Sequence, residues 1–398
     1  MTEQAKVPAI RFAGFTDPWE QRKFGDCFEF LKSNTLSRAG LNGENGTARN
    51  VHYGDILIKF GDCLDGERSD LPFITDDTVL PKFAGSILRE GDVIFADTAE
   101  DEAAGKCVEL RKLPKEPTIS GLHTIPARPR FFFGTGYLGH YLNSDAYHRQ
   151  LLPLMQGIKV ISVSKAALQD TQVRFPGLSE QAAIGAALSE IDNLITLHQR
   201  KYDKLVILIK SMLEKMFPKD GESVPEIRFA GFTDPWEQRK FSEIVDVCSG
   251  RDYKHLDEGP IPVYGTGGYM TSVSEALSHN RDAIGIGRKG TIDKPYLLKA
   301  PFWTVDTLFY AIPKSDINLE FALCSFLNVD WKSKDESTGL PSLSKESINE
   351  TVLSVPNVVE QNHLGNFFAD LDRLITLHQR KLELLQNIKK SLLDKMFV

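Results

Sequence analysis

Two stretches of the sequence combine glycine with arginine, lysine and aromatic residues in a way that suits contact with a nucleic acid. One runs from Pro126 to Tyr137, and the other consists of the two loops Tyr264–Tyr269 and Gly287–Thr291. Glycine lets the main chain come close to a ligand. Arginine can pair with guanine in the major groove, and lysine or main-chain N–H groups can hold phosphates. We predict that the residues in contact with DNA are Arg128, Arg130, Thr135, Gly136, Tyr137, Tyr264, Thr266, Gly267, Gly268, Arg288, Lys289 and Thr291.

These loops have other interpretations. Each could be an ordinary hairpin turn with solvated charges, and Arg288 could form a structural ion pair with Asp282 or Asp306. The run 132–136 also fits F-x-G-x-G, a short pattern found in S-adenosylmethionine-binding methyltransferases. However, no N-P-P-Y or D-P-P-Y accompanies it to hold a flipped base. Similar loops occur in both halves of the chain, which favours contact with a ligand.

The sequence carries none of the common catalytic motifs. It has no G-x-x-x-x-G-K-[ST] phosphate loop, no G-x-S-x-G and no H-E-x-x-H. Its five cysteines are scattered singly, without a C-x-x-C pair or a Cys/His ligand spacing. We therefore predict no catalytic residue and no metal site, and we expect reduced thiols in a cytoplasmic protein.

The composition is that of a globular protein with room for two or three domains. Of the 398 residues, 41% are hydrophobic and 25% are charged. No apolar run is long enough to span a membrane, and the first residues lack the apolar stretch of a signal peptide. The net charge of −7 is unusual for a protein that binds nucleic acid, but a binding face needs only local positive charge.

The elements that must position the loops occur twice. The segment Val7–Phe24 recurs as Val224–Phe241 with a single difference, and L-I-T-L-H-Q-R-K occurs at Leu194–Lys201 and again at Leu374–Lys381. The intervals differ, so the variable stretch of the first half is the longer one. A duplicated frame that carries two unlike modules is suited to reading two different targets.

The order of the blocks predicts a circular repeat. Each half runs from the repeated segment through a variable region to a long helix, and continuing past Val398 would lead back into Val7. We therefore expect the two ends of the chain to lie close together and the halves to be related by a pseudo-two-fold. The predicted segments are residues 1–24, 25–176, 177–218, 219–241, 242–356 and 357–398.

The long helical patterns predict a coiled coil. From about 179 to 217, and again in the second half, apolar or large residues recur three and four positions apart. Each stripe needs a partner, and we expect the two helices to pair in antiparallel order. The predicted seam consists of Leu194, His198, Tyr202, Leu205, Leu374, His378, Leu382 and Leu385. Roughly 36 helical residues span about 55 Å, so the pair could also hold two modules apart on one duplex.

The two variable regions predict modules of the α+β class. Short strands are expected at residues 55–60, 92–96, 283–287 and 304–310, separated by turns rich in Gly, Asn, Asp and Pro. Helices are expected near residues 143–154 and 320–327.

The repeated blocks resemble the conserved regions of type I restriction–modification specificity subunits, and the resemblance covers the whole chain in the same order. Glu180-Gln181 and Glu360-Gln361, which open the two helices after a proline, fit that family. The run T-G-L-P-S-L-S at 338–344 resembles a loop that often closes a target-recognition domain, whereas its equivalent at 156–162 departs from that form.

The resemblance implies an α+β protein with two α/β target-recognition domains, each reading one half of a split double-stranded DNA site, joined by two long antiparallel coiled-coil helices. It implies a non-catalytic subunit whose conserved helices dock two methyltransferase subunits, through which translocating restriction subunits join. S-adenosylmethionine, ATP and Mg would belong to those partners, with no cofactor in this chain. The alternative is a coiled-coil scaffold that gathers protein partners without binding DNA, but such a scaffold has no need of two unlike modules.

Overall fold

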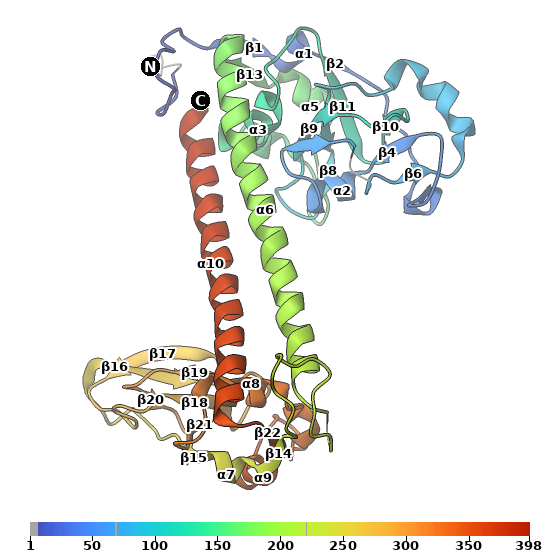
Figure 1. Cartoon of the computed structure of the whole chain (residues 1–398). Coiled ribbons are helices and arrows are strands. Elements are labelled where there is room, and N and C mark those ends of the chain that lie inside the picture. Colours follow the sequence, from blue (N-terminus) through green and yellow to red (C-terminus); the bar gives the residue numbers. More distant parts are fainter. Residues whose placement is uncertain (1–6, 68–69, 220) are drawn as a thin grey trace. The chain divides into compact units, whose positions relative to one another are not determined.

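A computed structural model describes residues 7–67, 70–219 and 221–398 (Figure 1). The first six residues of the expected segment 1–24, and residue 220 of the segment 219–241, lie outside the described residues. The chain forms two compact units. Unit 1 comprises residues 1–198 and 381–398, and unit 2 comprises residues 199–380. Two helices of 39 residues each, α6 (Leu178–Met216) and α10 (Val358–Met396), begin in one unit and end in the other.

Unit 1 is built on a five-stranded sheet in the order β2-β11-β7-β9-β5. Its central strand β7 is buried over its whole length and reads V-I-F-A, the continuous apolar run expected of a strand covered on both faces. A smaller sheet, β10-β4-β6-β3, and the pairs β1–β13 and β8–β12 complete the unit. The strands are β1 (Glu20–Lys23), β2 (Phe28–Phe30), β3 (Leu41–Asn42), β4 (Arg49–Val51), β5 (Cys63–Asp65), β6 (Phe73–Ile74), β7 (Val93–Ala96), β8 (Thr98–Ala99), β9 (Cys107–Lys112), β10 (Thr118–Ser120), β11 (Thr124–Pro129), β12 (Ile161–Ser162) and β13 (Gln172–Phe175). The short helices are α1 (Phe24–Cys27), α2 (Tyr53–Ile58), α3 (Tyr137–Asn143), α4 (Asp145–His148) and α5 (Lys165–Asp170).

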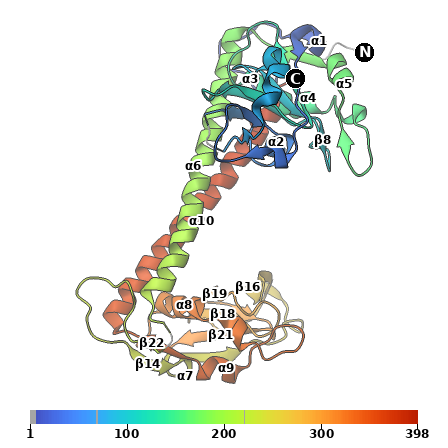
Figure 2. The same ribbon diagram turned by 90° about the vertical axis from the view of Figure 1, so that its right-hand side faces the viewer.

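Unit 2 repeats this plan with a four-stranded sheet, β15-β21-β18-β19, and a smaller sheet, β17-β16-β20. Figure 2 shows the larger sheet with α8 beside it. The strands are β14 (Glu237–Lys240), β15 (Val245–Ser249), β16 (Glu258–Gly265), β17 (Gly268–Val273), β18 (Ala283–Gly287), β19 (Tyr296–Leu298), β20 (Trp303–Thr304), β21 (Leu308–Pro313) and β22 (Val352–Val355). The short helices are α7 (Phe241–Ile244), α8 (Leu319–Asn328) and α9 (Lys345–Glu350).

The duplicated sequence makes the same contacts in both units. Arg11 forms a two-pronged ion pair with buried Glu180, at 2.6 and 2.7 Å, and Arg228 does the same with buried Glu360, at 2.7 and 2.8 Å. In each unit the next helix residue, a buried glutamine, donates from its side chain to the proline oxygen before the helix. The strand pair β1–β13 likewise matches β14–β22 residue for residue.

The circular repeat is confirmed by contacts within unit 1. The main-chain N–H of Ile10 donates to the oxygen of Lys395 at 2.9 Å, as that of Ile227 donates to Lys215 at 2.9 Å in unit 2. Trp19 meets the ring of Phe397 edge-on, with centroids 6.4 Å apart. The described part of the N-terminal segment therefore packs on the end of α10 (Figure 1), as the circular repeat predicts.

Within each unit, α6 and α10 run antiparallel. In unit 1, Leu188 of α6 packs in one core cluster with Met396, whereas Asp192, one turn further on, meets Lys389. In unit 2, Leu205 packs against the cluster that contains Leu371. Among the predicted seam residues, Leu382 is buried and Leu194, His198, Tyr202, Leu205, His378 and Leu385 are half-buried. Leu374 is 43% exposed instead, although Leu371, one turn earlier on α10, is buried.

Two of the expected strands differ in the structure. Residues 53–58, which overlap the strand expected at 55–60, form helix α2. His52 caps its first turn, and buried Asp55 accepts an ion pair from Arg38 at 2.6 Å. The strand expected at 304–310 is divided between β20 and β21, whereas β7, β18 and α8 lie where expected. No helix in the described part of the chain is long and apolar enough to cross a membrane.

Candidate nucleic-acid interface

The buried strand β18 ends at Gly287 and brings Arg288 and Lys289 to the surface of unit 2. Both side chains are exposed. The main-chain N–H of Arg288 donates to the oxygen of Thr307 at 2.8 Å, which fixes the loop to the start of β21. Its guanidinium lies 5.8 Å from the centre of the Phe309 ring. A strand end held in this way can present a charged side chain with little freedom to reorient.

The structural ion pair considered for Arg288 does not form with either carboxylate. Asp282 accepts instead from Lys299 at 2.9 Å and from the N–H of Ala300 at 2.8 Å. Arg288 donates to the main-chain oxygen of Asp306, at 3.4 Å, and not to its side chain. Neither of these two carboxylates therefore competes with a ligand for the guanidinium.

A second loop of unit 2 faces the first. Thr266 and Gly267 connect β16 to β17, and a side chain added at Gly290 would lie 4.0 Å from Oγ1 of Thr266. The predicted residues Gly268 and Thr291 flank these two loops and are half-buried. Tyr264 is also half-buried and packs against core residues, so its part is structural. Tyr269, which is 64% exposed at the start of β17, was not among the predicted residues.

A third loop joins this surface. We call residues 336–342 the closing loop of unit 2. The N–H of Gly290 donates to the oxygen of Pro341 at 2.8 Å, and Lys289 is bridged to Ser342. A hollow of about 360 Å³ lies here, lined by Arg288, Lys289, Ser342, Ser344, Lys345 and Glu346, among others. The run T-G-L-P-S-L-S was predicted to close a domain, but its contact with the loop of Arg288 was not predicted. Bridges between distant loops leave no local pattern in a sequence.

The glycine-rich loop of unit 1 has a different position and task. Gly136 has φ of 80° and caps α3, and the N–H of Gly134 donates to the side chain of Gln181 at 2.8 Å. The glycines thus let α3 approach α6 closely, since a side chain at Gly134 would come within 2.7 Å of the backbone of Ala182. Tyr137 is fully buried, and burial raises its pKa well above the usual range. That burial does not fit the predicted contact of Tyr137 with DNA.

The other predicted residues of unit 1 lie in or close to this glycine-rich loop in the sequence. Arg128 forms a two-pronged pair with buried Asp92, at 2.9 and 2.7 Å, so its guanidinium already has a structural partner. Arg130 is exposed and donates to the main-chain oxygen of Phe28 at 3.2 Å. Thr135 is exposed as well. None of the five predicted residues of unit 1, which are Arg128, Arg130, Thr135, Gly136 and Tyr137, lies at the position that Arg288 occupies in unit 2.

The structural counterpart of Arg288 and Lys289 in unit 1 is Asp97 and Thr98. Val163 donates its N–H to the oxygen of Asp97 at 2.8 Å, as Leu343 does to that of Arg288 at 3.0 Å. The serine after each donor then caps a short helix, α5 or α9. Residues 156–162, the closing loop of unit 1, pair with β8 at Thr98 and Ala99. The same position is therefore basic in unit 2 and acidic or neutral in unit 1.

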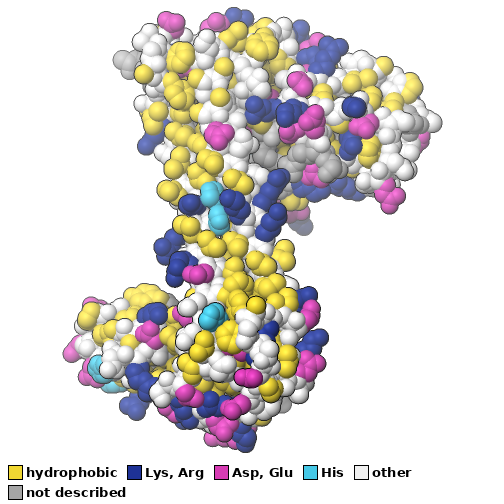
Figure 3. Space-filling model, viewed as in Figure 1, with side chains coloured by type: hydrophobic (Ala, Val, Ile, Leu, Met, Phe, Trp, Pro, Cys, Tyr) yellow, Lys and Arg dark blue, Asp and Glu magenta, His cyan; other side chains and the backbone are white. Residues whose placement is uncertain are grey.

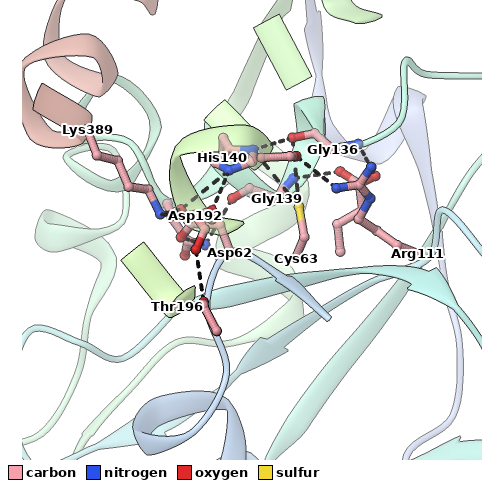
Figure 4. Close-up of polar contacts among 12 residues, drawn as sticks. Asp62, Cys63, Arg111, Gly136, Gly139, His140, Asp192, Thr196 and Lys389 are labelled. Carbon is pink, nitrogen blue, oxygen red and sulfur yellow. Dashed lines mark hydrogen bonds and ion pairs between the residues drawn. The ribbon is translucent and has the colours of Figure 1, made fainter. Parts of the chain in front are cut away.

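Unit 1 also contains a cluster of charges in which Asp62 and His140 are buried and Asp192 and Lys389 are half-buried (Figure 4). Nε2 of His140 lies 2.9 Å from Asp192, and its Nδ1 lies 2.5 Å from the oxygen of Gly136. The ammonium of Lys389 lies 2.7 Å from Asp62 and 2.5 Å from Asp192. Burial opposes the charge of Asp192, but the hydrogen bond from His140 and the charge of Lys389 hold its pKa below the usual range.

These residue types could ligate a metal, but a cation of the chain already lies among them. Asp62, His140 and Asp192 have ligand atoms within 4.8 Å of one another. Both carboxylates reach the Lys389 ammonium, and both Asp62 and Asp192 raise the pKa of Lys389 against the effect of burial. The arrangement is therefore best described as a buried ion cluster that joins the module to α6 and α10.

The long helices expose apolar side chains as well as burying them. Figure 3 shows hydrophobic side chains gathered on the visible face of these helices. On the helix parts that belong to unit 1, the exposed large apolar residues are Leu178, Leu197, Leu384 and Ile388, and on those of unit 2 they are Val206, Ile207, Leu208, Val358, Val359, Leu374 and Leu377. Exposed apolar surface beyond scattered single residues is typical of a protein-docking face.

Comparison with known proteins points to one family. The family model described as "Type I restriction modification DNA specificity domain" matches residues 233–387. The type I restriction enzyme MjaVIII specificity subunit of Methanocaldococcus jannaschii is 22% identical over 280 residues, which cover 60% of this chain and 64% of that protein. The matched part of the chain thus spans less than two thirds of that relative's length.

Two solved structures are similar in fold over nearly the whole chain. The crystal structure of a type I restriction–modification system S subunit from M. genitalium has a TM-score of 0.64 and 16% identity, and the match covers 98% of this chain and 99% of that one. A chain from a study of complex assembly and conformational transition of the type I R-M system has a TM-score of 0.50 and 15% identity, covering 95% and 97%.

Proposed function

Because the chain belongs to the family of type I restriction–modification DNA specificity subunits, we propose that each of its units reads one half of a split double-stranded DNA target. The chain itself performs no chemistry in this proposal. In unit 2 the reading surface consists of the loops around Thr266, Arg288 and Lys289 and the closing loop. Arginine at a strand end can recognise a base edge, while lysine and main-chain N–H groups hold phosphates.

One observation carries the proposal. The duplicated frame makes the same contacts in both units, down to the Arg11–Glu180 and Arg228–Glu360 pairs. At matching loop positions, however, unit 2 presents Arg288 and Lys289 whereas unit 1 presents Asp97 and Thr98. A frame kept constant under loops of unlike chemistry is what independent reading of two half-sites requires.

The partners in this proposal are methyltransferase subunits, which would dock on the exposed apolar side chains of the long helices. The duplication of the helices supports two such subunits, one for each repeat. S-adenosylmethionine would be bound by these subunits, and ATP and Mg by restriction subunits that join through them. The paired helices would also set the distance between the two half-sites on one duplex.

Exchange of one module tests the proposal. Residues 25–175 are replaced by the module of a related protein, and adenine methylation is mapped genome-wide in cells that contain the chain and its methyltransferase. We expect one half of the methylated motif to change while the other half and the gap stay the same. The reciprocal exchange of residues 242–356 is the matched control and should change the other half.

A second measurement addresses DNA binding directly. The full chain with its methyltransferase is incubated with a pool of random duplexes, and the retained duplexes are sequenced. Enrichment of a split motif supports the proposal. Retention of no preferred sequence, or a change of both half-sites after a single exchange, would overturn it.

A further inference from the structure

Leu340 stands out on the reading surface of unit 2, because a large apolar side chain is exposed at the tip of a loop that is held rigid. It is 66% exposed and follows Gly339. Single exposed leucines are common on protein surfaces, so exposure alone carries no weight. The argument rests on how the loop is built, what lies next to it and what occupies the same position in unit 1.

The two ends of the closing loop of unit 2 are held together by hydrogen bonds to one carboxylate. Oδ1 of Asp335 accepts from the N–H of Ser337 at 3.0 Å and from that of Ser342 at 2.9 Å. The N–H of Glu336 donates to the oxygen of Ser342 at 3.2 Å, which closes the loop. Hydrogen bonds from the N–H groups of Ser342 and Ser337 lower the pKa of Asp335, so this carboxylate stays charged at neutral pH. Leu340 is therefore presented on a preorganised loop, which reduces the entropy lost on binding.

The two residues that follow Leu340 contact the loop that carries the basic residues. The residue that follows it, Pro341, accepts the N–H of Gly290 at 2.8 Å, and Ser342 is bridged to Lys289. A polyanion held by Lys289 and Arg288 would thus lie beside the loop that carries Leu340. Apolar side chains contact thymine methyl groups in the major groove or wedge between base steps, and both contacts depend on sequence.

Unit 1 repeats the feature in the same register. Its closing loop is shut by the same hydrogen bond, from the N–H of Gln156 to the oxygen of Ser162 at 3.0 Å. Val160 stands two residues before Ser162, as Leu340 stands two before Ser342, and it is 55% exposed. Although the two loops share almost no sequence, each presents an apolar residue at this position.

We propose that Leu340 is a specificity-determining residue that makes an apolar contact with a base in the half-site read by unit 2. This inference rests on the proposed function. Leu340 supplies discrimination between sequences, whereas Lys289 supplies affinity that is independent of sequence. The corresponding residue in unit 1 is Val160.

The test compares Leu340→Ala and Leu340→Met in the full chain assembled with its methyltransferase. Affinity is measured for the duplex that carries the mapped motif and for a scrambled duplex. Leu327→Ala, which trims a 44% exposed leucine on α8 of the same unit, is the matched control. We expect Leu340→Ala to weaken binding to the motif about tenfold, to leave the scrambled duplex unaffected and to relax one base position in the second half-site. Leu340→Met, which keeps an apolar side chain, and the control should bind as the parent does.

The outcomes distinguish a failure of the role of Leu340 from a failure of the proposed function. If the parent binds motif and scrambled duplexes alike, the proposed function fails and the role of Leu340 fails with it. If the parent discriminates and Leu340→Ala discriminates equally well, the proposed function stands and the role of Leu340 is overturned. Equal weakening of both duplexes by Leu340→Ala also overturns it, because a base contact cannot act on a scrambled sequence.

Discussion

The two units fasten their variable modules to the same helices by different physical means. In unit 1, His140 of α3 lies against Asp192 of α6, and Lys389 of α10 reaches Asp192 and Asp62. In unit 2 the corresponding helix positions hold Cys324, Asp372 and Ile209. Cys324 is buried in an apolar core cluster against which Ile209 packs. The correspondence is anchored by Trp19 and Trp236, which meet Tyr137 and Phe321 at the same centroid distance of 6.1 Å.

The difference teaches that the duplicated frame does not dictate how a module is attached. A buried ion cluster depends on each of its members, because removal of one leaves an uncompensated charge in a region of low dielectric. An apolar contact tolerates substitution by side chains of similar volume. Unit 1 should therefore be sensitive to single changes at positions where unit 2 is tolerant.

The largest effect is expected from Lys389→Met in unit 1, for which Ile209→Met at the corresponding position of unit 2 is the comparison. Lys389→Met leaves Asp62 and Asp192 without their ammonium, so we expect the free energy of unfolding to fall by about 3 to 5 kcal/mol. Ile209→Met conserves volume and should cost less than about 1.5 kcal/mol. Thermal unfolding of the full chain, with hydrogen exchange to show which unit opens first, measures both. Equal losses for the two variants would remove the contrast between the units.

The pH dependence of stability sharpens the same contrast. Because folding lowers the pKa of Asp192 from 3.8, its contribution is complete above that value and is lost as the pH falls through the folded-state value. Because folding raises the pKa of Lys389 from 10.5, its contribution is complete below that value and is lost as the pH rises through the folded-state value. The difference in stability between the parent and Lys389→Met should thus shrink as the pH falls below the lower limit and as it rises above the upper one. A difference that stayed constant at both extremes would contradict this assignment.

The sequence predicted the frame well because its repeats are long and its helices are strongly periodic. The antiparallel long helices and the contact of the N-terminal segment with the end of α10 follow from such patterns, whereas strand β18 was predicted from a short run between turns. The glycine-rich loop 134–136 was misread because a loop that approaches a helix has the same composition as one that approaches a ligand. A signal was present in Gly185, a glycine inside α6, where a side chain would collide with the oxygen of Thr135.

Contacts between distant loops lay beyond the reach of the sequence. Nothing local indicates that Pro341 meets Gly290, or that residues 156–162 pair with Thr98 and Ala99. The buried ion cluster was missed for the same reason, since Asp62, His140, Asp192 and Lys389 are far apart along the chain. In the sequence, the cluster is visible only as one difference between the two long helices, because Lys389 of α10 stands at the repeat position that Ile209 occupies in α6.

The frame itself should respond equally in both units. Arg11→Met and Arg228→Met each strip the partner from a glutamate whose side chain is 2% or 1% exposed. We expect each variant to lose roughly 2 to 4 kcal/mol of stability, because a buried carboxylate is left unpaired. Hydrogen exchange should show the loss in unit 1 for the first variant and in unit 2 for the second. Losses that differ severalfold would mean that the repeated contacts are not energetically equivalent.

The smallest effects are expected at the matching loop positions, where the comparison turns from stability to DNA. Arg288→Ala should weaken binding to the mapped motif by about 1 to 3 kcal/mol and relax one base, because a positioned guanidinium reads a base edge. Lys289→Ala should weaken all duplexes alike and lower the salt slope by about one, because it removes one phosphate contact. Asp97→Ala, the matched change in unit 1, removes an anion and should neither weaken binding to the scrambled duplex nor lower the salt slope. Affinities for motif and scrambled duplexes at two salt concentrations separate these results. If the double variant of Arg288 and Lys289 binds as the parent does while Asp97→Ala does not, the reading surface of unit 2 has been assigned to the wrong loop.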